Sequence, residues 1–398
     1  MRIFLLLLCI SFGGFTSTKA QTDLKKGVVL DSIRVSGTTD ETFALYLPSS
    51  YDPQGLSPIV FIFEPAARGA IGIQPFIATS EKRGHILVCS NNSRNAPYER
   101  NFKIANALFN HIFTHFSIKE DEMYVSGFSG GARLAAAIAT LTDQFAGVIG
   151  CGAGFSGVPG HTPSIQKYAY VGLCGDRDMN YKEMVKNKEF LSLMELKSTL
   201  ITYDGEHQWP PSEQIERAFD WLYLQKVITT RPLTKVAVRP YYQADVKILE
   251  ALSQGENKLL LAEQYERMLE DYAGLLPLDS LETVQKELLS SPVHKKQLAS
   301  LEGALQTERK LIGKLVKQLQ TDLENPNKVN FGWWEKEVAK LTRIAKDGDE
   351  ETQKMVFRVK FDLFVRAYSR KNAFLHQTNQ EQAALVDHFI TLFYPKSK

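Results

Sequence analysis

The sequence predicts an α/β fold with a mostly parallel, doubly wound sheet, followed by an all-α C-terminal region. Up to about Lys226, short apolar runs alternate with helical runs, which is the pattern of successive β–α–β units. From Tyr241 onward this strand pattern disappears and amphipathic helical stretches remain. A length of 398 residues also favours two domains. We therefore place a catalytic α/β domain at residues 21–228 and a helical domain at residues 229–398.

Eight apolar runs are predicted as strands, and from the third onward most are continuously apolar, as in strands buried on both faces. They are Gly27–Val35, Thr42–Leu47, Ile59–Phe63, Ile86–Cys89, Met123–Ser126, Val148–Cys151, Tyr168–Leu173 and Ser198–Tyr203. The first two resemble an antiparallel hairpin at a sheet edge. Four helices are predicted between the later strands, at Phe102–Phe116, Gly130–Leu141, Tyr181–Leu193 and Ser212–Gln225.

The C-terminal region shows amphipathic helical stretches throughout. They are Gln243–Ser253, Asn257–Tyr272, Ser280–Leu289, His294–Leu323, Phe331–Lys346, Glu350–Arg370 and Gln380–Phe393. The longest has leucines and isoleucine at alternating three- and four-residue steps, but heptads are not sustained. We therefore expect helical hairpins that pack on one another. A tetratricopeptide-like solenoid is the alternative, although the characteristic repeat pattern is absent.

The N-terminus has the pattern of a secretory signal peptide at residues 1–20. Arg2 precedes the apolar run Ile3–Ile10, and small residues lead to a cleavage position after Ala20. The run is too short to span a bilayer. Lipidation at Cys9 is the alternative, but it leaves almost no apolar segment before the cysteine. We expect a secreted or periplasmic protein.

Charge and cysteine usage exclude several classes of function. Cleavage would remove Arg2 and Lys19 but no acidic residue, so the formal net charge falls from +2 to zero. Nothing in this balance favours nucleic acid or an anionic membrane as partner. The remaining Cys89, Cys151 and Cys174 are odd in number, which favours buried thiols over a disulfide framework. No Cys/His cluster has metal-ligand spacing, so we expect neither metal nor cofactor.

The pentapeptide Gly127–Gly131 has the form G-x-S-x-G between a predicted strand and a predicted helix. This is the pattern of a nucleophile elbow, in which a serine lies on a sharp strand-to-helix turn. Gly127 and Gly131 remove side chains that would clash in such a turn. Ser129 is therefore the predicted nucleophile. The N–H of Gly130 follows it at the positive end of the helix and is the predicted first oxyanion donor.

A serine nucleophile needs a base, and the base needs an orienting acid. In strand–elbow–helix enzymes the chain order is serine, acid, histidine. Four of the eight histidines precede any plausible acid and three lie in the helical region, so only His207, in the loop after the last predicted strand, remains. Two aspartates follow the preceding strand. We favour Asp178 as the acid, with Asp176 as the alternative that instead pairs with Arg177 or closes the turn.

Three motifs together resemble the α/β-hydrolase superfamily: Gly127-Phe128-Ser129-Gly130-Gly131, Gly175–Asp178 and Gly205-Glu206-His207-Gln208-Trp209-Pro210. Within it they are similar to secreted esterases related to polyhydroxybutyrate depolymerases and to feruloyl or acetylxylan esterases. The resemblance extends over about residues 27–225 and none of the helical region. It implies ester hydrolysis by Ser129, Asp178 and His207.

One segment departs from that resemblance. Such esterases have a His-Gly pair after the strand equivalent to Ile59–Phe63, which supplies the second oxyanion donor, but here the segment reads Glu64–Gly69. Pro65 has no N–H to donate. We therefore predict that the amide of Ala66 is the second donor and that Arg68 neutralises Glu64.

Other residues are expected to contact the substrate. The polar segment Ser90–Asn95 follows a strand end and is expected on the active-site face, where Arg94 could meet an acidic group. Arg68 and Phe128 are expected near the same site. Trp209 is predicted to form a wall of an acyl or sugar subsite, or alternatively to pack its own loop.

Three functions are compatible with these residues. The first is a secreted serine esterase acting on a small-molecule or acylated carbohydrate substrate. The second is a peptidase on the same scaffold, weakened because no N-terminal propeller precedes the domain. The third is a binding or scaffold protein in which the helical domain carries the function and the hydrolase domain is weakly active or inactive. In the first interpretation the helical domain is not catalytic and recognises a protein partner or part of the substrate.

Overall fold

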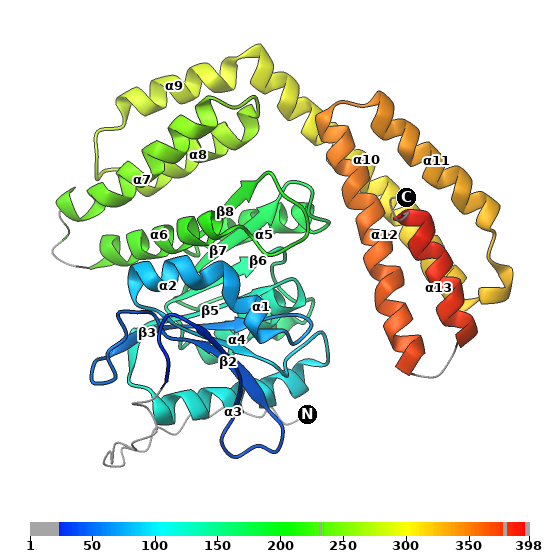
Figure 1. Ribbon diagram of the computed structural model, residues 1–398. Helices are drawn as coiled ribbons and strands as arrows, with labels where there is room; N and C mark the ends of the chain where they lie inside the picture. Colours follow the sequence, from blue (N-terminus) through cyan, green and yellow to red (C-terminus); the bar gives the residue numbers. More distant parts are fainter. Residues whose placement is uncertain (1–23, 231–232, 234, 377–379, 395–398) are drawn as a thin grey trace. The chain divides into compact units, whose positions relative to one another are not determined.

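The computed structural model describes residues 24–230, 233, 235–376 and 380–394 (Figure 1). The predicted signal segment, with Cys9, lies outside them. The chain divides into two compact units. One consists of the chain up to Cys174 with Glu183–Thr202 and Gln208–Tyr241, and the other consists of Gly175–Lys182, Tyr203–His207 and Tyr242–Lys398. The domain boundary near residue 228 stays a prediction.

The sheet has eight strands in the order β1-β2-β4-β3-β5-β6-β7-β8. Strands β1 and β2 pair antiparallel at the edge, β2 pairs antiparallel with β4, and the neighbours from β4 to β7 are parallel. The predicted fold class is therefore confirmed, and each predicted strand has its counterpart. The strands are β1 Val29–Arg34, β2 Thr42–Tyr46, β3 Ser57–Phe63, β4 Ile86–Ser90, β5 Ile118–Phe128, β6 Gly147–Cys151, β7 Ala169–Gly175 and β8 Ser198–Tyr203.

The four predicted helices of the α/β part are present, and the structure adds four short ones. The predicted helices are α3 Tyr98–His115, α4 Gly130–Thr142, α5 Tyr181–Leu193 and α6 Ser212–Thr229, and the added ones are α1 Gly69–Ile73, η2 Gln74–Phe76, α2 Ile77–Arg83 and η3 Pro159–His161. Helix α4 contacts β3, β5, β6 and α3, whereas α6 contacts α2 and η2. The added helices are too short to produce a helical period in the sequence.

Strand β5 is buried on both faces from Glu122 to Phe128, as its apolar run predicts. Val125 belongs to the same core as Phe61 and the α3 residue Phe109, whose ring lies 4.6 Å from that of Phe61. The neighbouring Tyr124 packs instead on Phe219 of α6, with ring centroids 5.4 Å apart. Because successive strand residues point to opposite faces, the two helical layers cover opposite faces of the sheet.

The C-terminal part is helical, as predicted. Its helices are α7 Lys235–Ser253, α8 Lys258–Asp271, α9 Asp279–Ser290, α10 Pro292–Glu324, η4 Pro326–Lys328, α11 Phe331–Asp347, α12 Glu350–His376 and α13 Gln380–Phe393. Helix α12 contacts α10, α11 and α13, which lie together as hairpins (Figure 1). Leu315, Leu319 and Trp334 are in the core of this group, and the indole Nε1 of Trp334 donates to Asp322 at 2.6 Å.

In the part of the chain that the structure describes, no helix is both long and apolar enough to cross a bilayer. Cys89, Cys151 and Cys174 are all buried, as the sequence predicts. Burial raises the pKa of Cys151 to about 12 and also raises the pKa of Cys89. Thiols in this environment stay protonated and inert at neutral pH.

Candidate active site

Ser129 lies between the last residue of β5 and the first residue of α4, in a strained conformation. Its φ is 54° and its ψ is −120°, which non-glycine residues rarely adopt. The turn is fixed on both sides. The N–H of Ser129 donates to the carbonyl of Cys151 at 2.8 Å, and the Ser129 carbonyl accepts from Ala132 at 3.0 Å. The strand–turn–helix context predicted for the nucleophile elbow is present.

The glycines of the elbow are required by close backbone approach. A Cβ on Gly127 would lie 2.3 Å from the carbonyl oxygen of Gly131. A Cβ on Gly131 would lie 2.0 Å from the carbonyl oxygen of Phe63, at the end of β3. Neither position can hold a side chain unless backbone moves, so the predicted role of both glycines is confirmed.

The structure brings His207 and Asp178 together. The Nδ1 atom of His207 lies 2.9 Å from both carboxylate oxygens of Asp178. The Asp178 side chain is 1% exposed and that of His207 is 7% exposed. A carboxylate facing Nδ1 favours the tautomer with a proton on Nδ1, which leaves Nε2 as the basic nitrogen.

The loops that contain these residues are joined through their backbones. The N–H of Asp176 donates to Tyr203 and that of Arg177 donates to Gly205, each at 2.8 Å. A Cβ on Gly175 would lie 2.4 Å from the carbonyl carbon of Gly205. The two glycines thus allow the acid loop and the histidine loop to cross in direct contact.

Asp176, the alternative acid, has other partners. Its Oδ2 lies 2.9 Å from Nζ of Lys354, and its Oδ1 lies 3.7 Å from Nη1 of Arg177. Its backbone carbonyl accepts from Nη1 of Arg358 at 2.7 Å. The pairing with Arg177 was one of the alternatives for this residue. Of the two aspartates, Asp178 is therefore the one with the geometry of an orienting acid.

The backbone of the loop after β3 donates hydrogen bonds to Glu64, a residue that is only 1% exposed. Glu64 accepts from the N–H of Ala66 at 2.7 Å, from the N–H of Arg68 at 3.0 Å, and from the Arg68 guanidinium. The predicted pairing of Arg68 with Glu64 is confirmed. The N–H of Ala67 donates to the Glu64 carbonyl at 3.2 Å.

These bonds affect the predicted second oxyanion donor. The N–H of Ala66 is already donated to Glu64, and the N–H groups of the next two residues, Ala67 and Arg68, are donated to the same residue. Ala66 could serve as a donor only by sharing or breaking its bond to a buried carboxylate. Its role stays a prediction, and the sequence gives no sign of this cost.

Replacing Arg68 with glutamine should destabilise the fold. The hydrogen bond to Glu64 is the main cause that raises the pKa of Arg68, so the guanidinium stays charged at neutral pH. Removing a partner from a buried charged group costs about 1–3 kcal/mol. We expect R68Q to lower the free energy of unfolding in urea by about this amount, and E64Q/R68Q to lose less. An R68Q protein as stable as the wild type would contradict this.

The predicted substrate residues have mixed positions. Trp209 packs on Phe76 and Phe128, with ring centroids 5.9 Å and 5.5 Å away. Its buried Nε1 has no hydrogen-bond partner among the described residues. Arg94 is exposed, and its backbone forms an isolated bridge with Ala66. Packing of the tryptophan loop is thus established, while substrate contact by these side chains remains a prediction.

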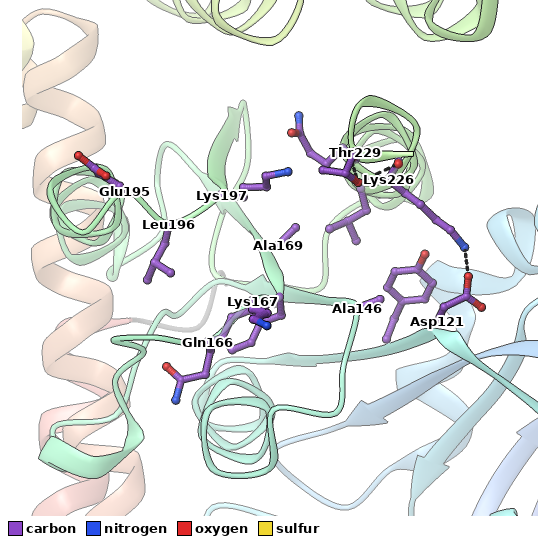
Figure 2. A pocket seen from close by; sticks show the side chains of 14 residues that line it. Asp121, Ala146, Gln166, Lys167, Ala169, Glu195, Leu196, Lys197, Lys226 and Thr229 are labelled. Carbon is purple, nitrogen blue, oxygen red and sulfur yellow. Dashed lines mark hydrogen bonds and ion pairs between the residues drawn. The ribbon is translucent and has the colours of Figure 1, made fainter. Parts of the chain in front are cut away.

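A cavity of about 450 Å³ lies elsewhere in the first unit (Figure 2). Its lining includes Ala146, directly before β6, and Ala169, the first residue of β7. It is therefore at the amino ends of the strands, whereas Ser129 follows the carboxyl end of β5. No predicted site residue lines it. Lys226, which does, is paired with Asp121 at 2.7 Å.

Among the described residues, no group of three or more histidine, cysteine, aspartate or glutamate side chains is arranged to hold a metal ion. Lys354 and Arg358, which hold Asp176, were missed from the sequence. They belong to a predicted helix, and Arg358 is 182 positions away from Asp176. No local motif indicates such a contact.

Neither family models nor curated proteins match this chain. Solved structures do resemble it in part. The S-formylglutathione hydrolase FrmB of Staphylococcus aureus covers 49% of this chain and 95% of its own, with 15% identity and a TM-score of 0.41. The fluorophosphonate-binding serine hydrolase FphF of the same organism covers 50% of this chain and 99% of its own, with 14% identity and a TM-score of 0.42. A ferulic acid esterase covers 49% of this chain and 96% of its own, with 14% identity and a TM-score of 0.39.

At these identities and TM-scores, the similarities give no information about the chemistry of this chain. The fold assignment rests on its own strand order and elbow, and the chemistry rests on the geometry of its side chains.

Proposed function

We propose that this protein is a serine hydrolase that cleaves carboxylic esters. The observation that supports this most directly is the strained backbone of Ser129 at an elbow of close-packed glycines. A non-glycine residue is held at positive φ only where the surrounding structure imposes it, and such residues gather at active sites. The buried pair of His207 and Asp178 supplies a base with an oriented tautomer.

The reaction would proceed through an acyl-enzyme. The Oγ of Ser129 attacks the ester carbonyl while Nε2 of His207 accepts its proton, and Asp178 stabilises the imidazolium through Nδ1–H. The N–H of Gly130, at the positive end of α4, donates to the oxyanion of the tetrahedral intermediate. As this intermediate collapses, His207 returns the proton to the leaving alcohol. A water molecule activated by His207 then hydrolyses the acyl-enzyme by the same steps.

The substrate would be a small or carbohydrate-linked ester in an extracytoplasmic compartment. Trp209 and Phe128 offer an aromatic wall for an acyl or sugar group, and the exposed Arg94 suits an acidic substituent. Export would follow cleavage after Ala20. The helical hairpins would recognise a protein partner or a distal part of the substrate, since their residues include no further triad.

Labelling with a fluorophosphonate probe tests this function. We expect the full-length protein to be labelled, with the adduct mapped by peptide mass spectrometry to Ser129. Turnover should be seen with p-nitrophenyl acetate, with methyl ferulate or acetylated xylan as larger esters, and not with peptide p-nitroanilides. An unlabelled protein that hydrolyses none of these esters would refute the proposal. Preferential cleavage of the anilides would assign the chain to the peptidases instead.

A further inference from the structure

We propose that the side-chain amide of Asn95 is the second oxyanion donor, an inference that rests on the proposed esterase function. A tetrahedral oxyanion is normally held by two donors, and losing one costs about 10²–10³ in turnover. The N–H of Gly130 supplies one. The backbone amides of residues 66 to 68 all donate to Glu64. A second donor therefore has to come from another group beside the elbow.

Asn95 is the polar side chain that lies against Gly130. A Cβ built on Gly130 would lie 1.8 Å from Oδ1 of Asn95, 2.8 Å from its Cγ and 3.4 Å from its Nδ2. The carboxamide thus fills the space beside the residue whose N–H is the first donor. This position also explains why residue 130 is glycine. A half-turn about Cβ–Cγ exchanges oxygen and nitrogen, and a developing oxyanion selects the orientation that presents N–H.

The backbone of Asn95 is held firmly while its side chain stays exposed. Its N–H donates to the carbonyl of Pro65 at 2.9 Å. The preceding Arg94 is fixed by Asn101, whose Nδ2 donates to the Arg94 carbonyl at 2.8 Å. Substitution of Asn95 therefore removes the carboxamide and leaves the backbone bonds in place. Because the segment is already in place, only the carboxamide has to rotate when charge develops.

Kinetics of Asn95→Ala and Asn95→Asp test the proposal on the full chain. Both should lower kcat for p-nitrophenyl acetate by about 10²–10³, with KM nearly unchanged, because the bond strengthens only as the carbonyl oxygen becomes an anion. A trifluoromethyl ketone, which forms a hemiketal oxyanion on the serine, should lose affinity by a similar factor. Asn110→Ala, an exposed asparagine on α3, serves as the control and should change neither value.

Two results would overturn the inference. One is a folded Asn95→Ala protein with kcat close to that of the wild type. The other is a fall in kcat with unchanged affinity for the trifluoromethyl ketone, since Asn95 would then only fill the space beside Gly130 and would not donate to the oxyanion. Asn95→Asp keeps the shape but replaces the N–H donors with a charge that repels an oxyanion, so a kcat close to that of the wild type in this variant would overturn the inference even should Asn95→Ala fold poorly. Failure of the wild type to react with fluorophosphonate would refute the proposed function itself.

A separate observation, within the second unit, points to a positioning role for α12. Lys354 reaches Asp176 and also pairs with Glu350 and Glu351 at 2.7 Å and 2.8 Å. Arg358, only 1% exposed, donates to the Asp176 carbonyl and pairs with Glu308 of α10 at 2.6 Å. We infer that these two cations hold the acid loop in the position that Asp178 needs to orient His207.

The contacts leave little freedom to the loop. Burial alone would lower the pKa of Lys354, but its interactions with Glu350, Glu351 and Asp176 raise it, so the cation persists at neutral pH. Farther along α12, the ring of Phe361 lies 5.8 Å from that of His207. The same helix therefore contacts His207 directly and the loop of Asp178 through Asp176, and a displacement near 1 Å can cost about a hundredfold in rate.

Lys354→Met and Lys354→Arg test this role, with Trp334→Phe as a control that weakens the helical core away from the loop. We expect Lys354→Met to lower kcat about tenfold or more with little change in KM, and Lys354→Arg to restore most of it. Trp334→Phe should lower the melting temperature and keep kcat. If kcat falls equally in Lys354→Met and Trp334→Phe at matched stability, or does not fall in Lys354→Met, α12 has only a structural role.

Discussion

Replacing Ser129 with alanine should abolish ester hydrolysis while the protein remains folded. Loss of a nucleophile that works with a base costs about 10⁵–10⁶ in kcat, because the covalent route disappears. Alanine at φ 54° suffers the same strain as serine, so the melting temperature should hardly change. The measurement is turnover of p-nitrophenyl acetate by purified full-length protein, together with a thermal melt.

Ser129→Gly separates strain from chemistry. Glycine adopts positive φ without a steric cost, so this variant should be as inactive as Ser129→Ala but more stable than the wild type by about 1 kcal/mol. If Ser129→Ala keeps a substantial part of the wild-type rate in a preparation free of contaminating esterase, Ser129 is not the nucleophile. The function would then have to be sought in the helical hairpins.

Much of the fold could be predicted because each element has a clear pattern of its own. Continuously apolar runs locate strands buried on both faces, and α5 begins and ends where its predicted helical run does, at Tyr181 and Leu193. The elbow could be recognised in the sequence because Gly127 and Gly131, two residues before and after the serine, remove side chains that would clash in the turn. The helices between Gly69 and Arg83 were missed, since none is long enough to show a helical period.

The site could be predicted only as far as chain order reaches. Order along the chain identified His207, and in the structure its Nδ1 lies within hydrogen-bond distance of the Asp178 carboxylate. What remained hidden depends on contacts between distant segments. Asn95 lies against Gly130, and Arg358 donates a hydrogen bond to Asp176. No motif around any of these residues indicates either contact. The hydrogen bond from the Ala66 N–H to Glu64 joins residues that are close in the sequence. It depends on the direction of the Glu64 side chain, which a residue pattern does not specify.

Replacing Asp178 with asparagine should be among the most damaging changes, exceeded only by loss of the serine or of His207. Asparagine can accept at Nδ1 only through its oxygen and cannot compensate the charge of an imidazolium. It can also present N–H to Nδ1, which stabilises the wrong tautomer. We expect kcat for p-nitrophenyl acetate to fall about 10⁴-fold. In His207→Ala, kcat should fall at least as far.

Asp176→Asn is the matched control, because it makes the same chemical change two residues away in the same loop. Its carbonyl bond to Arg358 does not involve the side chain, and Lys354 keeps Glu350 and Glu351 as partners. We therefore expect a loss of about tenfold, similar to that of Lys354→Met and far short of the cost of a wrong tautomer. Should Asp176→Asn instead cause the larger fall, Asp176 would be the acid in the working enzyme. The 2.9 Å contact between Asp178 and His207 would then be a resting arrangement that substrate binding rearranges.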